Sequence, residues 1–250
     1  MIERDEQVDD LGRGLRIIQK RQGFKYGTDS VLLAKFVQMS RDILPGRCAG
    51  SLKCVDLGTG TGILPLLLSR DPRFSEISGL EIQADYAEMA ARSIAMNCLE
   101  DRLHIVKGDI KNAAEIYGRA SVQAVVTNPP YKKLGAGIRS ISEKEAVARH
   151  EVCCTLEDVI RSSSLLLSPG GGFFMIHRPE RLADAMEFMR KYRLEPKYLQ
   201  FVFPKPGRRP SMFLTAAVRG GGHNLVIQEP LILMDREGRE TEELRKIYAY

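Results

Sequence analysis

The segment Asn128-Pro129-Pro130-Tyr131 contains the residue types that could activate a planar amino group. The nitrogen of such a group shares its lone pair with a π system, so it attacks poorly until acceptors hold its N–H bonds. The Asn128 side-chain oxygen and the Pro129 carbonyl can be those acceptors, and consecutive prolines restrict the preceding residues to extended geometry. Tyr131 can stack on a planar substrate. These four residues are the predicted catalytic set, acting by orientation and electrostatics.

A glycine-rich loop upstream could hold the second reactant. Residues 56–62 read Asp-Leu-Gly-Thr-Gly-Thr-Gly and overlap the end of an apolar run at residues 54–57. Gly58 and Gly60 have no Cβ atom and tolerate positive φ, so the backbone there can approach a ligand closely. Ile63 occupies the third glycine position of the nicotinamide fingerprint, and no GK[ST] sequence of a P-loop follows. The loop therefore predicts a different class of cofactor.

Acidic residues follow the next two predicted strands. Glu81 lies about 20 residues after the loop, where a carboxylate commonly accepts hydrogen bonds from ribose hydroxyls. Asp109 could accept a hydrogen bond from an adenine amino group. With Asp56, they suit an adenosine ligand without phosphates, and S-adenosylmethionine, a sulfonium with an ammonium group, fits. The predicted cofactor-binding set from these stretches is Asp56, Gly58, Thr59, Gly60, Gly62, Glu81, Ile82, Asp109, Ile110 and Asn128.

Each motif also has a purely structural interpretation. The glycines can form a tight strand-to-helix turn, Glu81 and Asp109 can be solvated strand-end acids, and Asn-Pro-Pro can simply end a strand. Their joint placement after successive strands favours a ligand site, because open α/β sheets bind ligands at that edge.

Apolar runs alternate with helical stretches along most of the chain, and the pattern predicts an α/β, Rossmann-like fold with a mostly parallel sheet. Strands are expected at residues 54–57, 77–82, 103–106, 122–126, 172–177, 198–203 and 212–218. Helices are expected at residues 63–69, 84–97, 156–167 and 179–192. The last two strands would form an antiparallel pair. We expect one domain over 1–250, with an N-terminal extension (1–50), a core (51–220) and a C-terminal appendage (221–250).

The composition predicts a soluble, cytoplasmic protein. The 250 residues are 44% hydrophobic and 28% charged, and no apolar run approaches the ~20 residues of a membrane span. The N-terminus lacks the features of a secretory signal, and five cysteines without a CxxC framework favour a reducing compartment. His150, Cys153 and Cys154 do not provide the spaced ligands of a tetrahedral site, so no metal is expected.

These motifs resemble class I S-adenosylmethionine-dependent methyltransferases of the amino-methylating kind, with the NPPY turn as a hallmark. More narrowly, the chain resembles the bacterial valine-tRNA adenine N6-methyltransferase family. The supporting segments are residues 23–29 (GFKYGTD), 79–83 (GLEIQ), 148–151 (ARHE) and 177–182 (HRPERL). The resemblance implies a seven-stranded sheet with helices on both faces and methylation of the adenosine beside the anticodon of a valine tRNA. It also implies that Tyr26, Gly27, Thr28 and Asp29 close over the methionine end of the cofactor.

An RNA substrate would need cationic contacts and access to a base. The net charge is +5, from 37 basic and 32 acidic residues, which permits an anionic partner without demanding one. The target adenine would be splayed out of a loop and stacked. The candidate phosphate contacts are Lys132, Lys133, Arg139 and Arg149 after the catalytic turn, and Lys205, Arg208 and Arg209 later in the chain. Acidic residues dilute the first cluster and are absent from the second, which departs from the family's pattern at residues 205–211.

Two other functions stay open from the sequence. A glutamine amide methyltransferase acting on release factors shares the NPPY turn, but it carries a helical N-terminal domain, and only about 50 residues precede the glycine loop here. A non-catalytic RNA-binding module could keep the loop without the activity. The intact Asn128 and cofactor set argue against that module.

Overall fold

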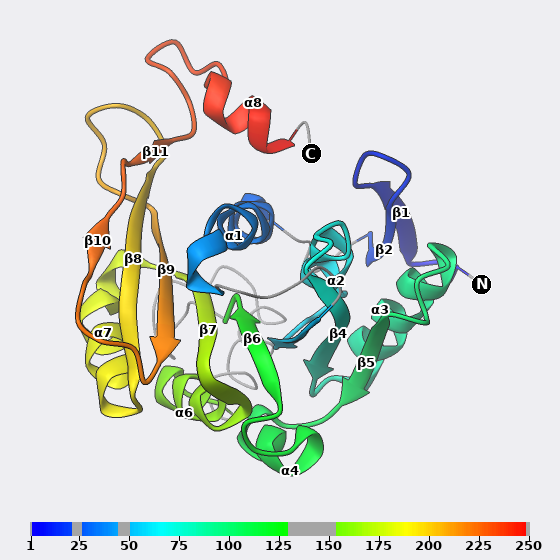
Figure 1. Ribbon diagram of the computed structural model, residues 1–250. Coiled ribbons are helices and arrows are strands. Elements are labelled where there is room, and N and C mark those ends of the chain that lie inside the picture. Colours follow the sequence, from blue (N-terminus) through cyan, green and yellow to red (C-terminus); the bar gives the residue numbers. More distant parts are fainter. Residues whose placement is uncertain (1, 22–26, 45–50, 130–153, 249–250) are drawn as a thin grey trace.

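The computed structural model describes residues 2–21, 27–44, 51–129 and 154–248, and these form three layers with a mixed sheet between two groups of helices (Figure 1). The seven long strands are β3 (Leu52–Leu57), β4 (Phe74–Glu81), β5 (Leu103–Lys107), β6 (Val122–Thr127), β7 (Leu167–His177), β8 (Leu194–Phe203) and β9 (Met212–Arg219). The main helices are α1 (Thr28–Met39), α2 (Ile63–Leu68), α3 (Ala84–Met96), α4 (Ala113–Tyr117), α6 (Leu156–Leu166) and α7 (Leu182–Lys191). Short 3-10 helices are η1 (Arg41–Ile43), η2 (Ile110–Asn112) and η3 (Pro179–Arg181).

The strand order places two strand ends side by side at the site. Along the sheet the order is β10-β8-β9-β7-β6-β3-β4-β5, where β10 is the short strand Val226–Ile227, and a second short strand, β11 (Leu231–Ile232), also pairs with β8. The chain runs outward from β3 through β4 to β5 and then returns to the other side of β3 as β6, with parallel pairing throughout. The carboxyl ends of β3 and β6 therefore form a topological switch point, where open α/β sheets bind ligands.

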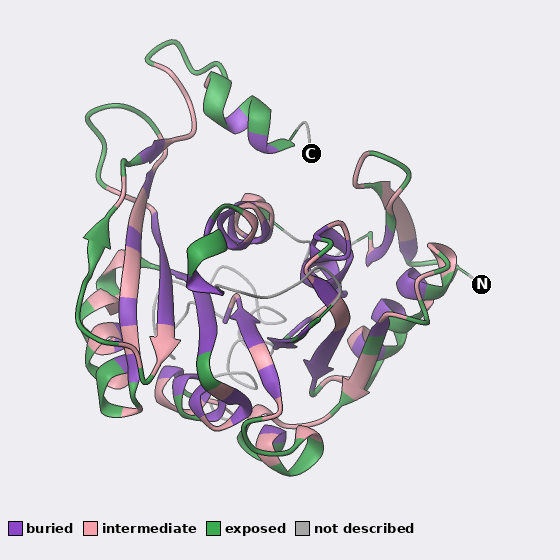
Figure 2. Cartoon of the chain, in the orientation of Figure 1, coloured by how far each residue is buried: buried purple, intermediate pink, exposed green. Residues whose placement is uncertain are grey.

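Two apolar cores lie on opposite faces of the sheet. Helices α1 and α2 pack over one face and α4, α6 and α7 over the other, and the central strands between them are buried (Figure 2). Strand β6 reads as an almost continuous apolar run because both of its faces are covered. Helix α6 starts at a capping box, in which the Thr155 hydroxyl and the Asp158 carboxylate satisfy each other's backbone N–H groups.

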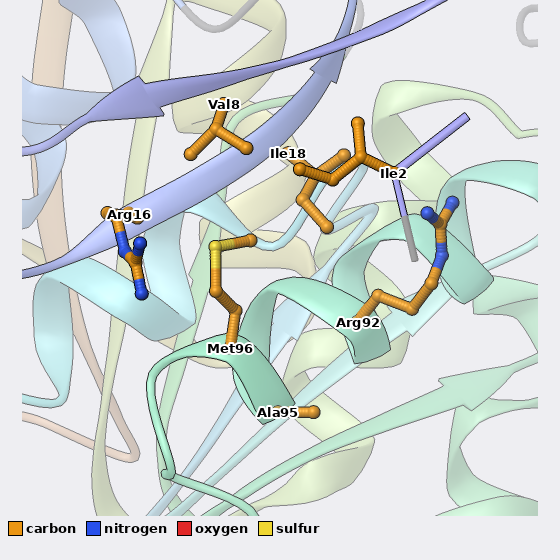
Figure 3. Close-up of a pocket in the computed structure, with 7 residues that line it drawn as sticks. All are labelled: Ile2, Val8, Arg16, Ile18, Arg92, Ala95 and Met96. Carbon is orange, nitrogen blue, oxygen red and sulfur yellow. The ribbon is translucent and has the colours of Figure 1, made fainter. Parts of the chain in front are cut away.

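An N-terminal hairpin, β1 (Glu6–Asp10) and β2 (Arg16–Lys20), packs against α3, and the sequence patterns did not predict it. The buried Glu6 carboxylate accepts hydrogen bonds from Arg92 at 2.6 and 2.8 Å. The Arg92 guanidinium lowers the pKa of Glu6 to about 2. A small pocket lies between the hairpin and α3 (Figure 3), lined by Ile2, Val8, Arg16, Ile18, Arg92, Ala95 and Met96.

The C-terminal segment adds to both the sheet and a helical layer. Strands β10 (Val226–Ile227) and β11 (Leu231–Ile232) pair in parallel with β8, so the sheet gains two short strands beyond the seven expected. Helix α8 (Glu242–Tyr248) packs on α1, and the Tyr248 hydroxyl donates to Thr28 Oγ1 at 2.9 Å. The end of α8 thus lies beside the start of α1.

The predicted fold class is confirmed, with seven long strands close to their expected positions. Three strands begin earlier than expected: β4 begins at Phe74 and not at residue 77, β8 at Leu194 and not at residue 198, and β7 at Leu167 and not at residue 172. The glycine-rich segment before residue 172 is therefore part of β7. Its glycines permit close packing there, since a Cβ atom on Gly172 would lie 3.0 Å from Ile43 and Leu44 side-chain atoms. Within the described ranges, every helix is too short or too polar to cross a bilayer.

Candidate functional site

The glycine loop leaves the end of β3 in a conformation that side chains would strain. Gly58, Gly60 and Gly62 have φ angles of 79°, 57° and 83°, a region that favours glycine. The Gly58 and Thr59 N–H groups donate to the Leu80 carbonyl at 2.9 and 3.1 Å, which ties the loop to β4. Gly79 of β4, which was not among the predicted site residues, contributes to this contact. A Cβ atom there would lie 2.7 Å from the Thr59 side chain, so Gly79 makes room for the loop.

Glu81 holds the loop from the end of β4. Its side chain is buried, with 3% of the residue exposed. Oε2 accepts from the Gly60 N–H at 2.9 Å and Oε1 from the Gln83 N–H at 2.9 Å. The alternative interpretation of Glu81 as a solvated strand-end acid is therefore wrong. Each carboxylate oxygen keeps a further lone pair that can accept a ligand hydroxyl.

Asp56 is the most unusual ionisable group of the site. It is fully buried, and within the described residues neither carboxylate oxygen has a well-formed hydrogen bond. Burial raises the pKa of Asp56 to about 7, the neighbouring Thr59 hydroxyl opposes the rise, and the Glu81 charge adds to it. A buried carboxyl group in this state fits the neighbourhood of a cationic ligand, which favours its charged form.

The raised pKa of Asp56 predicts a pH-dependent stability. Between about pH 4 and pH 7 the folded chain keeps a proton that the unfolded chain has released, so this group lowers the free energy of unfolding as pH rises. Asp56→Asn removes that dependence. The difference in melting temperature, variant minus wild type, should therefore increase by at least about 2–4 °C from pH 5 to pH 8. Thermal unfolding without cofactor, repeated at each pH, measures this difference. The control is Asp101→Asn, at an exposed position. Parallel plots of melting temperature against pH for Asp56→Asn and the wild type would contradict the prediction.

The loop after β5 lies next to the glycine loop. Asp109 caps η2, because its Oδ1 accepts from the Lys111 N–H at 2.9 Å. The Asp109 side chain is 26% exposed, so it is open to further donors. Ile110 lies close enough that a Cβ atom on Gly58 would be 3.7 Å from its Cδ1 atom. Ile82, after β4, is 40% exposed, which is unusual for an isoleucine beside a core strand and suits a contact with a flat ligand.

The predicted catalytic turn is attached to the end of β3 and to α1. The Thr127 hydroxyl, fully buried, donates to the Leu57 carbonyl at 2.9 Å, which joins the last residue of β6 to the last residue of β3. Asn128 follows, and its Nδ2 donates to the Ser30 hydroxyl at 3.1 Å. Pro129 is buried. Pro130 and Tyr131 lie outside the described residues. Neither Thr127 nor Ser30 was in the predicted set, since a single hydroxyl carries no spacing signal.

The start of α1 contributes the segment that the family resemblance placed over the cofactor. Gly27 precedes the helix in extended geometry, and Thr28 and Asp29 form its first turn. Asp29 Oδ1 accepts from the Ser30 N–H at 2.9 Å, and a Cβ atom on Gly27 would lie 2.7 Å from that same oxygen. Glycine therefore leaves room for the Asp29 carboxylate. The structure brings this turn to Asn128 through Ser30, whereas Tyr26 lies outside the described residues.

The later basic cluster lies on the turn between β8 and β9. Lys205, Arg208 and Arg209 are exposed, and the Arg208 N–H closes the turn on the Lys205 carbonyl at 3.2 Å. None of the three forms an ion pair with another described residue. The turn leaves the sheet where Phe213 of β9 pairs with His177, the last residue of β7. Because β7 runs parallel to β6, the turn lies at the same edge of the sheet as the predicted catalytic turn. The earlier candidates Lys132, Lys133, Arg139 and Arg149 lie outside the described residues.

Together these elements fit S-adenosylmethionine. The residues that would hold it are Asp56, the glycines of the loop, Glu81 and the Asp109–Ile110 pair. They provide a buried carboxyl group without a hydrogen-bond partner among the described residues, a loop with glycine at three positions, and a partly exposed acceptor. A ligand with an ammonium group, a ribose and an adenine requires such groups.

Comparisons with known proteins agree with this geometry. A family model described as methyltransferase small domain matches residues 38–191. The tRNA1(Val) (adenine(37)-N6)-methyltransferase of Porphyromonas gingivalis is 31% identical over 212 residues, covering 83% of this chain and 76% of that protein. The protein of the same name from Tolumonas auensis is 26% identical, covering 91% of this chain and 83% of that protein.

Solved structures of methyltransferases share the fold. A predicted O-methyltransferase of Agrobacterium tumefaciens superimposes with a TM-score of 0.67 at 22% identity, covering 88% of this chain and 95% of that one. The Thermus thermophilus 16S rRNA N2 G1207 methyltransferase, solved with AdoMet and guanosine, gives a TM-score of 0.59 at 20% identity, covering 86% of this chain and 50% of that one.

Proposed function

We propose that this chain, which belongs to the methyltransferase small domain family, transfers the methyl group of S-adenosylmethionine to the N6 amino group of an adenine in tRNA. The relatives named tRNA1(Val) (adenine(37)-N6)-methyltransferase align over most of the chain and support this substrate. Their names also point to the finer target, adenosine 37 of a valine tRNA.

One observation carries the proposal: the Thr127–Leu57 hydrogen bond joins the end of β6 to the end of β3. Backbone pairing between these strands extends only to Asp56 and Val126. The side-chain bond continues the connection by one more residue, and Asn128 and Gly58 are the residues that directly follow its two partners. A group that binds an amine is thereby fixed next to a loop suited to a methyl donor.

The residues of the chain act by holding the amine. When bound, the cofactor supplies an electrophilic methyl group on sulfur. The Asn128 Oδ1 and the Pro129 carbonyl accept hydrogen bonds from the two N–H groups of the substrate amine. These two hydrogen bonds turn the nitrogen lone pair out of conjugation with the ring. The nitrogen would form its bond to the methyl carbon as the bond from that carbon to sulfur breaks. The methylated nitrogen would then lose its extra proton to water, so no side chain has to act as a strong base. Catalysis then depends on fixed dipoles and orientation.

The direct test is methyl transfer from labelled S-adenosylmethionine to total bacterial tRNA, total rRNA and purified release factor in parallel. We expect label in tRNA, recovered as N6-methyladenosine after nucleoside analysis. A valine tRNA transcript with guanosine in place of adenosine 37 should lose the label. Label confined to release factor would select a glutamine amide methyltransferase, and cofactor binding without any transfer would select a non-catalytic module.

The exposed turn between β8 and β9 predicts a salt-dependent contact with the RNA backbone. Replacing Arg208 and Arg209 by serine should weaken tRNA binding and reduce the slope of log affinity against log salt concentration by about 1–2, since each phosphate contact contributes roughly 0.7–0.9. Binding isotherms at several salt concentrations measure the slope.

The matched control for this prediction is the pair Arg119→Ser and Arg193→Ser. Both arginines are exposed. Arg119 lies shortly before β6 and Arg193 directly precedes β8, so both lie at the opposite edge of the sheet. The control removes the same charge, so its salt slope should stay close to that of the wild type. Equal slopes for the two double variants would contradict a contact at the β8–β9 turn.

A further inference from the structure

Ser30 contacts the catalytic asparagine from a distant part of the sequence. Its hydroxyl accepts from Asn128 Nδ2 at 3.1 Å across a separation of 98 residues. Ser30 is 4% exposed, and its backbone N–H is bonded to Asp29 Oδ1 at 2.9 Å and to the Gly27 carbonyl at 3.3 Å. The Ser30 backbone is therefore fixed in the first turn of α1, which limits the movement of the Ser30 hydroxyl.

The orientation of the Asn128 carboxamide decides whether it can bind an amine. One end of a carboxamide donates and the other accepts, while the two ends have almost the same shape. The substrate amino group is a donor, so Oδ1 must face it. If the carboxamide were rotated by half a turn about its Cβ–Cγ bond, the Nδ2 N–H group would face the N–H group of the substrate. The substrate amine would then lack its hydrogen-bond acceptor.

We propose that Ser30 is a positioning residue for methyl transfer. A serine hydroxyl can accept from Nδ2 or donate to Oδ1; in the structure it accepts from Asn128 Nδ2, which holds that end of the carboxamide against α1 and directs Oδ1 toward the substrate amine. The inference rests on the proposed function only in requiring that the group that receives the methyl is a planar NH2 group. It divides the work between two hydroxyls, because Thr127 fixes the backbone of the turn through Leu57 and Ser30 fixes the side chain.

The first test separates turnover from cofactor affinity. Ser30→Ala should lower kcat by about tenfold, the size of one lost hydrogen bond, with the affinity for S-adenosylmethionine nearly unchanged. Ser30→Thr keeps the hydroxyl and should restore most of the rate. Ser163→Ala is the matched control, since Ser163 is a buried helical serine whose hydroxyl, among the described residues, bonds the Val159 carbonyl of its own helix α6. Its kcat should equal that of the wild type.

A second background distinguishes positioning from general support. A carboxylate has two equivalent oxygens, so Asp at position 128 cannot be presented the wrong way round. In single-turnover measurements, Ser30→Ala should therefore slow Asn128→Asp much less than it slows the wild type. An equal loss in both backgrounds, or a loss of cofactor affinity with unchanged kcat, would overturn the proposal.

The role of Ser30 is read separately from the identity of the substrate. Rates are measured on whichever acceptor the wild type labels, tRNA or release factor, so a failure with tRNA refutes the proposed function and leaves Ser30 testable. A readout without turnover is the hydrogen exchange of the Asn128 side-chain amide by NMR. Its protons should exchange faster in Ser30→Ala, and also in Ser30→Cys, but not in Ser163→Ala. Unchanged exchange in both Ser30 variants would show that the hydroxyl does not hold the carboxamide.

Discussion

Replacing Asn128 by alanine is expected to lower kcat by roughly 10²–10³-fold, the loss seen when one preorganised polar group is removed from the reacting centre. The variant keeps the glycine loop and Glu81, so its affinity for S-adenosylmethionine should stay close to that of the wild type. Isothermal titration with the cofactor and single-turnover methyl transfer measure the two quantities independently.

The comparison variant for Asn128→Ala is Asn224→Ala, which removes the same side chain from an exposed position after β9. Its turnover should match that of the wild type. Normal turnover by Asn128→Ala would refute the mechanism. A loss of folding, visible as a large drop in melting temperature, would instead assign Asn128 a structural role.

Replacing Glu81 by glutamine is expected to raise the dissociation constant for S-adenosylmethionine by about 100-fold. The carboxylate accepts two backbone N–H groups, from Gly60 and Gln83, each at 2.9 Å. Glutamine has one acceptor oxygen, so its NH2 end must face an N–H group. Hydrogen bonds to charged groups are worth about 1.5–3 kcal/mol each, and about 3 kcal/mol corresponds to 100-fold in affinity. Isothermal titration measures the change.

The control for this variant is Glu76→Gln on the same strand. Glu76 is 38% exposed and pairs with Lys53 at the surface, so the cofactor affinity should not change. At saturating cofactor, Glu81→Gln should recover most of the wild-type kcat, whereas Asn128→Ala should not. A loss of kcat by Glu81→Gln with unchanged affinity would show that Glu81 acts on the reaction and not on the loop.

The sequence revealed the strands of the central sheet well because their apolar runs reflect burial on both faces. The runs at 122–126 and 172–177 became β6 and β7, which are buried almost throughout. The N-terminal hairpin escaped prediction because its stability comes from α3, through the Glu6–Arg92 ion pair and the bond from the Ile18 N–H to Ser93. Helix α1 also lay within the stretch interpreted as an extension.

Within the site, the sequence indicated residue types and the structure decided their environments. Glu81 and Asp56 are both acids near strand ends, yet Glu81 accepts two backbone N–H groups and Asp56 has its pKa raised to about 7 by burial. The difference arises from which atoms surround each carboxyl group, and neighbours from other strands carry no signal in the local sequence.

By itself, the sequence determined the fold class and located the glycine loop and the predicted catalytic turn, because strand periodicity, glycine conformations and consecutive prolines are local properties of the chain. Only the tertiary structure decided that β6 returns beside β3, that Thr127 joins the two strand ends, and that Ser30 meets Asn128. These contacts join residues 70 and 98 positions apart. They exist because burying both faces of the sheet brings those segments together, which no local pattern of the sequence encodes.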